Sequence, residues 1–133
     1  MENCIFCMIA KKEVSSQIIY ETEQIISFLD INPVAKGHCL IIPKKHYNDV
    51  FDMPDAELNK IIAASKHVSE LVCKNLGATG VNLLNASGKD AQQSVFHFHM
   101  HIIPRYKDDC FDAWPKSNYN EKNIEEIRKK LTK

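Results

Sequence analysis

Residues 94–106 read SVFHFHMHIIPRY and place a histidine at every second position of an apolar run, at His97, His99 and His101. Alternate side chains of a β-strand point to opposite faces, so the spacing predicts a strand with the three imidazoles on one face and the apolar side chains on the other. Side chains two residues apart in a strand are separated by ~6.7 Å, which gives a row of rings ~13 Å long. That length matches the sugar and phosphates of a nucleotide.

A chain of 133 residues with 44% apolar content can bury one core, so we expect a single domain spanning residues 1–133. Seventeen basic and seventeen acidic side chains give zero net charge, which argues against nucleic acid or a membrane surface as a partner. The start, MENCIFCMIAKKE, lacks the long apolar core of a signal peptide, and no later segment approaches the ~20 apolar residues of a membrane span. We therefore expect a cytoplasmic protein.

Two of the five cysteines form a C-x-x-C pair, Cys4 and Cys7. An odd number of cysteines without an export signal argues for reduced thiols. The pair supplies half of a tetrahedral zinc site, whereas a thioredoxin-like redox role is disfavoured because no βα unit precedes it. His46, in the sequence PKKH, and His97 are candidates for the other two ligands because each is expected at the end of a core strand. The residues alone leave this pairing open.

Apolar periodicity and turn residues predict strands at residues 16–21, 24–30, 38–43, 80–85 and 95–103. Helices are predicted at residues 3–11, 54–76 and 121–131. A polar loop, residues 86–94, precedes the histidine strand. One long helix against five strands joined by short connections predicts an α+β fold with a largely antiparallel sheet, because a doubly wound fold needs more helices between its strands.

Three interpretations of the histidine row are open. The row is a solvated strand face, a metal site in itself, or a site for chemistry on phosphorus. A metal site by itself lacks a nearby acidic residue to complete an obvious catalytic zinc set. The polar loop NASGKDAQQS, which ends at Ser94, favours phosphorus chemistry because its backbone amides and hydroxyl can turn toward a phosphate.

Electrostatics also favour the third interpretation. Two unit charges ~6.7 Å apart at an effective dielectric constant of 20 repel by ~2.5 kcal/mol, which is equivalent to nearly two pKa units. The three rings are therefore not all charged near pH 7, and a neutral, nucleophilic ring beside a protonated donor becomes well populated. Nucleophilic catalysis on a phosphate requires this pairing.

Three blocks of the chain resemble, in the same order, the blocks of the histidine triad (HIT) family of nucleotide hydrolases and transferases. They are CIFCMIAKKE near the start, FLDINPVAKGHCLIIPKKH at residues 28–46 and QSVFHFHMHIIPRY at residues 93–106. The last contains the family signature of three histidines alternating with apolar residues. The similarity is to the small bacterial-type, Hint-like branch, which acts on purine nucleoside phosphoramidates and related adenylates. It implies a five-stranded antiparallel sheet, a long helix, a shorter C-terminal helix and a homodimer with a ten-stranded sheet.

The resemblance implies catalytic roles for four residues and a supporting role for a fifth. His99 matches the nucleophile that forms a nucleotidyl-histidine intermediate. His101 matches the contact to the phosphate and the leaving group, helped by Ser94 and Gln93. His38 matches a histidine whose ring lies close behind the nucleophile.

The nucleotide site is implied in the same way. Asp30 matches the acidic residue that holds the ribose hydroxyls, and Asn85 matches a residue near the phosphate. The residues that match the apolar slot for the base are Ile5, Phe6, Ile9, Phe28 and Ile31. Without the resemblance the apolar residues would be interpreted as ordinary core, and Asp30 as the start of an Asx-type turn.

The resemblance also implies structural zinc, because several relatives with this C-x-x-C pair bind it. The implied ligands are Cys4, Cys7, His46 and His97. Relatives without the cysteines work without metal, so no metal is expected in the chemical step.

One residue departs from the family pattern. Relatives usually have a glycine before the Gln-Ser of the phosphate loop, where this chain has Gln92. If that position requires positive φ, Gln92 must strain or reshape the loop.

The sequence thus predicts a hydrolase that cleaves at the α-phosphorus of a purine nucleoside phosphoramidate or adenylate and releases the nucleoside monophosphate. One alternative is asymmetric cleavage of a dinucleoside polyphosphate, for which Arg105 and Lys107 are the local basic pair. Another is a zinc-stabilised dimer that binds nucleotides with little turnover. Trp114, in the segment after the histidine strand, is expected to reach the partner subunit's site, as C-terminal segments do in relatives.

Overall fold

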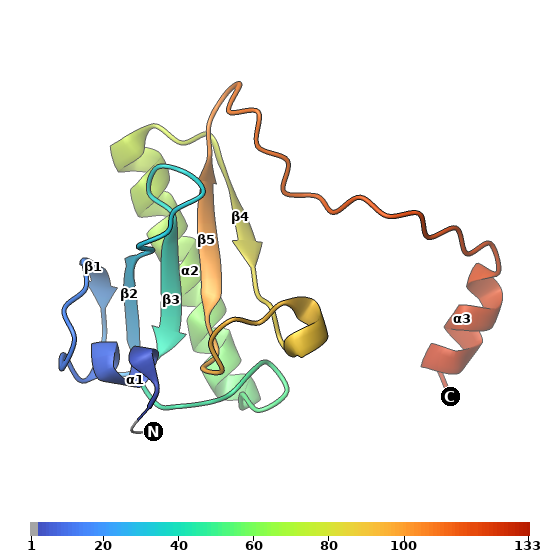
Figure 1. Cartoon of the computed structure of the whole chain (residues 1–133), viewed down its shortest axis with the longest axis horizontal. Helices are drawn as coiled ribbons and strands as arrows, with labels where there is room; N and C mark the ends of the chain where they lie inside the picture. The colour runs from blue at the N-terminus through green and yellow to red at the C-terminus, as the bar shows by residue number, and fades with distance from the viewer. Residues whose placement is uncertain (1–2) are drawn as a thin grey trace.

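The computed structural model describes residues 3–133, which form a five-stranded antiparallel sheet and three α-helices (Figure 1). The strands lie in the order β1-β2-β3-β5-β4. Their bounds are Ile18–Glu21 (β1), Ile25–Leu29 (β2), Cys39–Pro43 (β3), Gly80–Leu84 (β4) and Met100–Arg105 (β5). The helices are Ile5–Ala10 (α1), Asp55–Leu76 (α2) and Ile124–Leu131 (α3). The α+β class and the antiparallel sheet are therefore as the sequence predicts.

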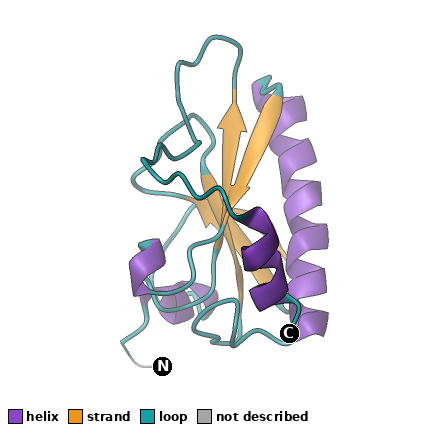
Figure 2. Cartoon of the chain, turned by 90° about the vertical axis from the view of Figure 1, so that its right-hand side faces the viewer, coloured by secondary structure: helices purple, strands orange, loops and turns teal. Residues whose placement is uncertain are grey.

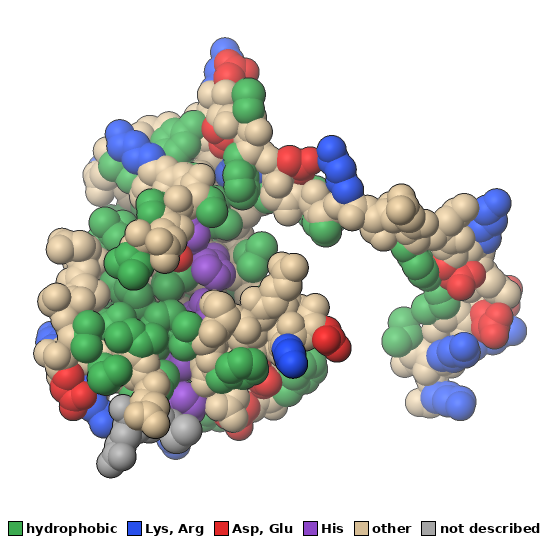
Figure 3. Space-filling model, viewed as in Figure 1, with side chains coloured by type: hydrophobic (Ala, Val, Ile, Leu, Met, Phe, Trp, Pro, Cys, Tyr) green, Lys and Arg blue, Asp and Glu red, His purple; other side chains and the backbone are tan. Residues whose placement is uncertain are grey.

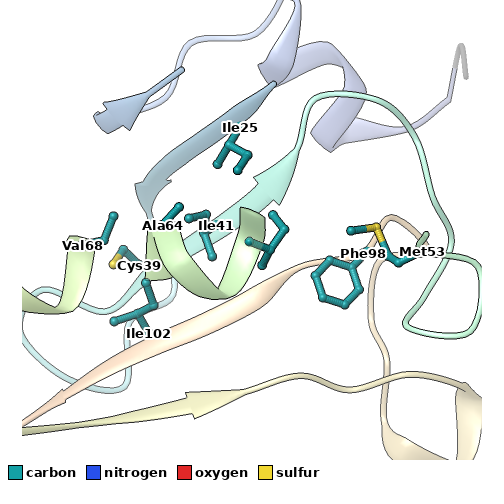
Figure 4. Packing of buried hydrophobic residues seen from close by; sticks show 9 residues of the cluster. Ile25, Cys39, Ile41, Met53, Ala64, Val68, Phe98 and Ile102 are labelled. Atoms are coloured by element: carbon teal, nitrogen blue, oxygen red, sulfur yellow. The ribbon is translucent and has the colours of Figure 1, made fainter. Parts of the chain in front are cut away.

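The long helix α2 lies along one face of the sheet, as Figure 2 shows. Its Val68 and Ala64 pack against Ile41 of β3 and Ile102 of β5 in the larger core cluster (Figure 4). Helix α2 begins after Pro54 and ends at Gly77, whose φ of 77° is readily adopted by a residue without a side chain. The predicted helix at residues 54–76 is confirmed to within one residue.

The other face of the sheet packs against the short helix α1. Phe6 and Ile9 of α1 contact Phe28 of β2 and Leu40 of β3 in a second core cluster. The central strands β2 and β3 are buried on both faces because alternate residues serve the two clusters. The α1 side of the sheet also carries the histidines.

The predicted strand at residues 95–103 is wrong at its start, since β5 begins at Met100. His97 and His99 lie before the strand, where the backbone finds partners outside the ladder. The Phe98 N–H donates to the Tyr47 carbonyl, and the Asn85 side chain donates to the His99 carbonyl. The alternation survives this irregular backbone, because Phe98 and Ile102 join the α2 cluster while the histidines face α1.

Two further differences concern the loops. The polar loop at residues 86–94 contains a single 3-10 turn, Lys89–Ala91, which the sequence did not indicate. The predicted C-terminal helix at residues 121–131 begins at Ile124, and the segment before it extends away from the sheet (Figure 1). No helix among the described residues is both long and apolar enough to cross a membrane.

Candidate active site

A cavity of about 510 Å³ opens on the α1 side of the sheet. It is built by α1, the end of β2 with the loop after it, β3, and the segment leading into β5. Figure 3 shows imidazoles beside a patch of apolar side chains on this face. Of the nucleotide-site and catalytic residues that the sequence predicts, those lining the cavity are Ile5, Phe6, Ile9, Phe28, Asp30, Ile31, His38, Ser94, His99 and His101.

The apolar half of the cavity is centred on Phe6. Its ring packs edge-on against Phe28 at 5.7 Å and against His99 at 5.1 Å between ring centroids. Ile31 is 91% exposed at the rim, and Ile5 is also exposed. Exposed aliphatic side chains beside a buried aromatic wall are suited to cover a flat ring.

His99 is the best-positioned nucleophile in the cavity. Its Nδ1 lies 2.8 Å from the His97 carbonyl, so Nδ1 carries the proton and Nε2 keeps its lone pair. The side chain is 2% exposed, and its burial lowers the pKa of His99, which keeps the ring neutral. The bond from Asn85 to the His99 carbonyl fixes the backbone at this position.

His38 and His101 form a hydrogen-bonded pair of imidazoles beside His99. The Val34 N–H donates to His38 Nδ1 at 3.1 Å, which leaves the proton of a neutral ring on Nε2. That nitrogen lies 2.9 Å from His101 Nδ1, so His101 accepts there and carries its own proton on Nε2. The carboxylate of Asp30 lies 3.5 Å from His38 Nε2 and 4.0 Å from His101 Nδ1. Both rings therefore present a defined tautomer.

The charges around this pair predict an unusual titration. Burial, with His99 and His38 nearby, lowers the pKa of His101 to about 4, and the Asp30 carboxylate opposes this shift. By NMR we expect the His101 ring to titrate near pH 4, and at still lower pH in Asp30→Asn because a favourable negative charge is lost. Glu70→Gln, on the exposed side of α2, is the charge-matched control and should leave the midpoint unchanged. A midpoint at or above pH 6.5 in the wild type would contradict this account.

Four other side chains converge below the cavity, and they are the four predicted zinc ligands. The ligand atoms of Cys4, Cys7, His46 and His97 all lie within 4.8 Å of one another. Cys7 Sγ lies 3.3 Å from His46 Nδ1 and 3.5 Å from His97 Nδ1, and Cys4 Sγ lies 3.5 Å from His97 Nδ1. Metal–sulfur bonds of ~2.3 Å and metal–nitrogen bonds of ~2.0 Å at tetrahedral angles produce edges of about this length.

The tautomers in this cluster fit a metal. His97 Nε2 donates to the Pro43 carbonyl at 2.8 Å, and His46 Nε2 donates to the Asn48 side-chain oxygen at 3.0 Å. Both Nδ1 lone pairs therefore face the two sulfur atoms, and each ring is oriented from behind. Burial and the neighbouring Cys4 raise the pKa of Cys7, so the thiolate form of Cys7 would need a cation beside it.

The group formed by Asp30, His38 and His101 also has the spacing of a metal site. It differs from the cysteine–histidine cluster in which ring nitrogens carry hydrogens. The Val34 N–H occupies His38 Nδ1, so His38 Nε2 carries a hydrogen toward His101 instead of a free lone pair. A metal in this group would have to displace that hydrogen bond, so we interpret the group as proton-handling.

Two residues of the predicted nucleotide site, Gln93 and Asn85, do not line the cavity. Gln93 is buried, accepts from the Gly88 N–H, and donates to the carbonyls of Asn48 and Val95. Its side chain thus holds the loop before the histidines, as the Asn85 side chain holds His99. Sequence reasoning missed Asn48, which binds both His46 and Gln93, and its only signal is its position two residues after His46.

Gln92 adopts the left-handed conformation that the missing glycine suggests, with φ of 68° and ψ of 30°. This conformation costs a residue with a side chain ~1–2 kcal/mol, whereas glycine loses ~0.5–1 kcal/mol more chain entropy on folding. We expect Gln92→Gly to raise the free energy of unfolding by about 0.5 kcal/mol in urea denaturation. Ala91→Gly is the control and should lower it, because Ala91 is not among the residues with positive φ. Equal effects of the two changes would contradict the assignment of strain to Gln92.

A buried neutral imidazole, a hydrogen-bonded imidazole pair and an apolar slot lie together on a five-stranded antiparallel sheet, as expected for a histidine triad protein. A model of the HIT domain matches residues 11–108, and the chain belongs to the HIT family of nucleotide-hydrolysing and nucleotide-binding proteins. The chain is 41% identical over 128 residues to Protein hit of Bacillus subtilis, an alignment that covers 96% of this chain and 88% of that protein.

Two further relatives bear on the site. A crystal structure of a zinc-bound histidine triad protein from Mycobacterium smegmatis matches with a TM-score of 0.81 and 33% identity, over 88% of this chain and 85% of that one. Adenylylsulfatase HINT3 of Arabidopsis thaliana is 37% identical over 111 residues, which are 84% of this chain and 56% of that protein.

Proposed function

We propose that the protein hydrolyses purine nucleoside 5′-phosphoramidates or related adenylates at the α-phosphorus through a nucleotidyl-His99 intermediate, releasing the nucleoside monophosphate. The observation that carries the proposal is the tautomer of His99. Its Nδ1–H is held by the His97 carbonyl, and its Nε2 lone pair is free in a cavity of nucleotide size. The relative HINT3 is an adenylylsulfatase, which supports chemistry at the same phosphorus.

We propose one orientation for a nucleotide in this cavity. The base fits the apolar slot around Phe6, and the ribose hydroxyls face the carboxylate of Asp30. The Oδ1 atom of this carboxylate accepts from the Asn32 N–H. This places the α-phosphate against His99 and His101, with the Ser94 hydroxyl at the rim. Gln93 and Asn85 act on the phosphate indirectly, by holding the loop and the nucleophile.

The reaction proceeds in two displacements. The His99 Nε2 lone pair bonds to phosphorus while the bond from phosphorus to the leaving nitrogen breaks. That nitrogen departs with the electron pair and takes a proton from His101 Nε2. The bound phosphate supplies negative charge that raises the pKa of the His38–His101 pair, so the pair carries this proton when substrate is bound. Water then attacks phosphorus and returns a proton to the pair, and the electron pair of the His99–phosphorus bond returns to Nε2.

The charges of the site favour an amine leaving group over a polyphosphate. Among the described residues, no Lys or Arg lines the cavity. Arg105, the basic residue expected to contact a polyphosphate, is held by both oxygens of Asp109 and by Asn82 near the far end of β5. A chain of phosphates would therefore be desolvated without cationic partners, which is costly.

We also propose that Cys4, Cys7, His46 and His97 hold a structural zinc ion. The donor set, the two free Nδ1 lone pairs and the zinc named in the Mycobacterium smegmatis relative support this. Such an ion would tie α1 to the segment before β5. The chemical step needs no metal.

A homodimer is proposed on the basis of the resemblance and of the exposed edge of the sheet. Strand β4 lies at the edge, and its Leu83 and Leu84 are about 40% exposed, so a second copy can extend the sheet to ten strands. The segment between β5 and α3 carries Trp114, which is 83% exposed, and extends away from the sheet (Figure 1). In the proposed dimer this segment would reach the partner. Sedimentation equilibrium tests this proposal, and a monomer at micromolar concentration would refute it.

Steady-state release of AMP tests the proposed substrate class. Adenosine 5′-phosphoramidate should be hydrolysed with a kcat/KM at least 100-fold above that for diadenosine tetraphosphate. A preference for the polyphosphate would favour the dinucleotide hydrolase, and nucleotide binding without turnover of either substrate would favour a binding protein. Competition by purine and pyrimidine monophosphates defines the base preference.

A further inference from the structure

A second cavity of about 450 Å³ adjoins the nucleotide cavity, and its lining includes Cys4 and His46 of the proposed zinc cluster. The two cavities share Ile5, Ser94 and Val95, which form the rim between them. Ser94 is exposed on this rim. A group attached to the phosphate at His99 therefore reaches the second cavity by crossing Ser94.

The walls of the second cavity are mainly apolar. Met8 of α1, Phe96, which is 52% exposed, and Val95 contribute apolar atoms to it. Asn48 contributes polar atoms, but its side-chain oxygen already accepts from His46. No Lys, Arg, Asp or Glu among the described residues lines the cavity. An exposed aromatic ring and a flexible thioether that line one cavity are suited to bind a flat or aliphatic group.

We propose that this second cavity binds the leaving group and selects an uncharged amine substituent that is apolar or aromatic. The inference rests on the proposed function. Because His99 is buried on the floor of the nucleotide cavity, in-line displacement sends the leaving group away from the floor, toward the rim. As the phosphorus–nitrogen bond breaks, the nitrogen takes the electron pair and one proton from His101, and its substituent remains in the cavity that Met8 and Phe96 line.

The difference in desolvation between apolar and charged substituents explains the proposed selectivity and sets its magnitude. An apolar substituent loses water-exposed surface in the second cavity, whereas a charged one is desolvated there without a counter-ion. Even one methylene group in a fitted apolar pocket changes kcat/KM by ~10-fold or more. A phenyl group in a cavity lined by these apolar side chains should therefore produce at least that preference.

The experiment compares adenosine 5′-phosphoramidates of ethylamine and phenethylamine, two unhindered primary amines, and the change of the rate ratio between the wild type and the variants cancels their difference in basicity. The wild type should prefer the phenethyl substrate by about tenfold or more in kcat/KM. Phe96→Ala and Met8→Ala should each reduce this ratio at least threefold. Phe51→Ala removes an equal side chain that is 86% exposed elsewhere, and should leave the ratio unchanged. Thermal melting verifies that each variant is folded.

A β-alanine phosphoramidate provides an anionic leaving group and should be cleaved at least tenfold more slowly than the phenethyl substrate. A ratio near one in the wild type, or a ratio that Phe96→Ala and Met8→Ala leave unchanged, would overturn the inference while hydrolysis of the ethyl substrate upholds the proposed function. Failure to cleave any of the three substrates would overturn both.

Discussion

Cys4→Ser is expected to abolish stoichiometric zinc binding and to lower the free energy of unfolding by about 3 kcal/mol or more, a fraction of the ~10–16 kcal/mol that structural zinc contributes in small domains. The reason is that the cluster joins three separate segments of the chain. Cys4 and Cys7 belong to the start of the chain, His46 follows β3, and His97 precedes β5. Losing one ligand releases α1, which also carries Phe6 of the apolar slot.

Metal content by atomic emission and the melting temperature measure this effect. A loss of 3 kcal/mol corresponds to a fall of about 10 °C or more in a chain of this size. Cys110→Ser is the matched control, because Cys110 is exposed and outside the cluster. Unchanged zinc content in Cys4→Ser would refute this ligand set.

His99→Ala is expected to lower kcat by about 10⁴-fold or more, because removing a covalent nucleophile typically costs this much. His99→Asn is the second variant, since its amide N–H can replace the bond to the His97 carbonyl and preserve the fold. Both variants should lose turnover alike. His67→Ala, an exposed histidine that packs against Tyr20 outside the cavity, should retain wild-type turnover.

Initial rates of AMP release measure this effect, with near-ultraviolet circular dichroism as the check of folding. His101→Ala should cost less, about 10²–10⁴-fold, because it removes proton donation but keeps the nucleophile. A rate in His99→Asn within tenfold of the wild type would remove His99 from its role.

Sequence periodicity predicted the sheet and α2 well, because buried strands and an amphipathic helix leave regular apolar patterns. It placed the start of the histidine strand wrongly. The bonds that end the ladder there, from Asn85 to the His99 carbonyl and from Phe98 to the Tyr47 carbonyl, join residues far apart in the chain. No local pattern encodes such contacts.

The residues of the candidate site were also predicted from the sequence, and their roles stay predictions. The histidine spacing and the resemblance predicted the residues, and the structure brings all four proposed zinc ligands together. The spacing and the resemblance could not predict which tautomer each imidazole ring adopts. The tautomers depend on the Pro43 and His97 carbonyls, the Val34 N–H and Asn48, which carry no signal of this role in the sequence. These partners distinguish the proposed metal cluster from the proposed proton relay among five nearby histidines.

The central claim is that His99 carries the nucleotide during turnover, and rapid-quench mass spectrometry of the wild-type protein with adenosine 5′-phosphoramidate tests it most directly. We predict a burst of protein carrying one adenylate, with the modification mapped by peptide sequencing to His99. Turnover without any adduct on the millisecond timescale, or an adduct on His101, His38 or another side chain, would contradict the account.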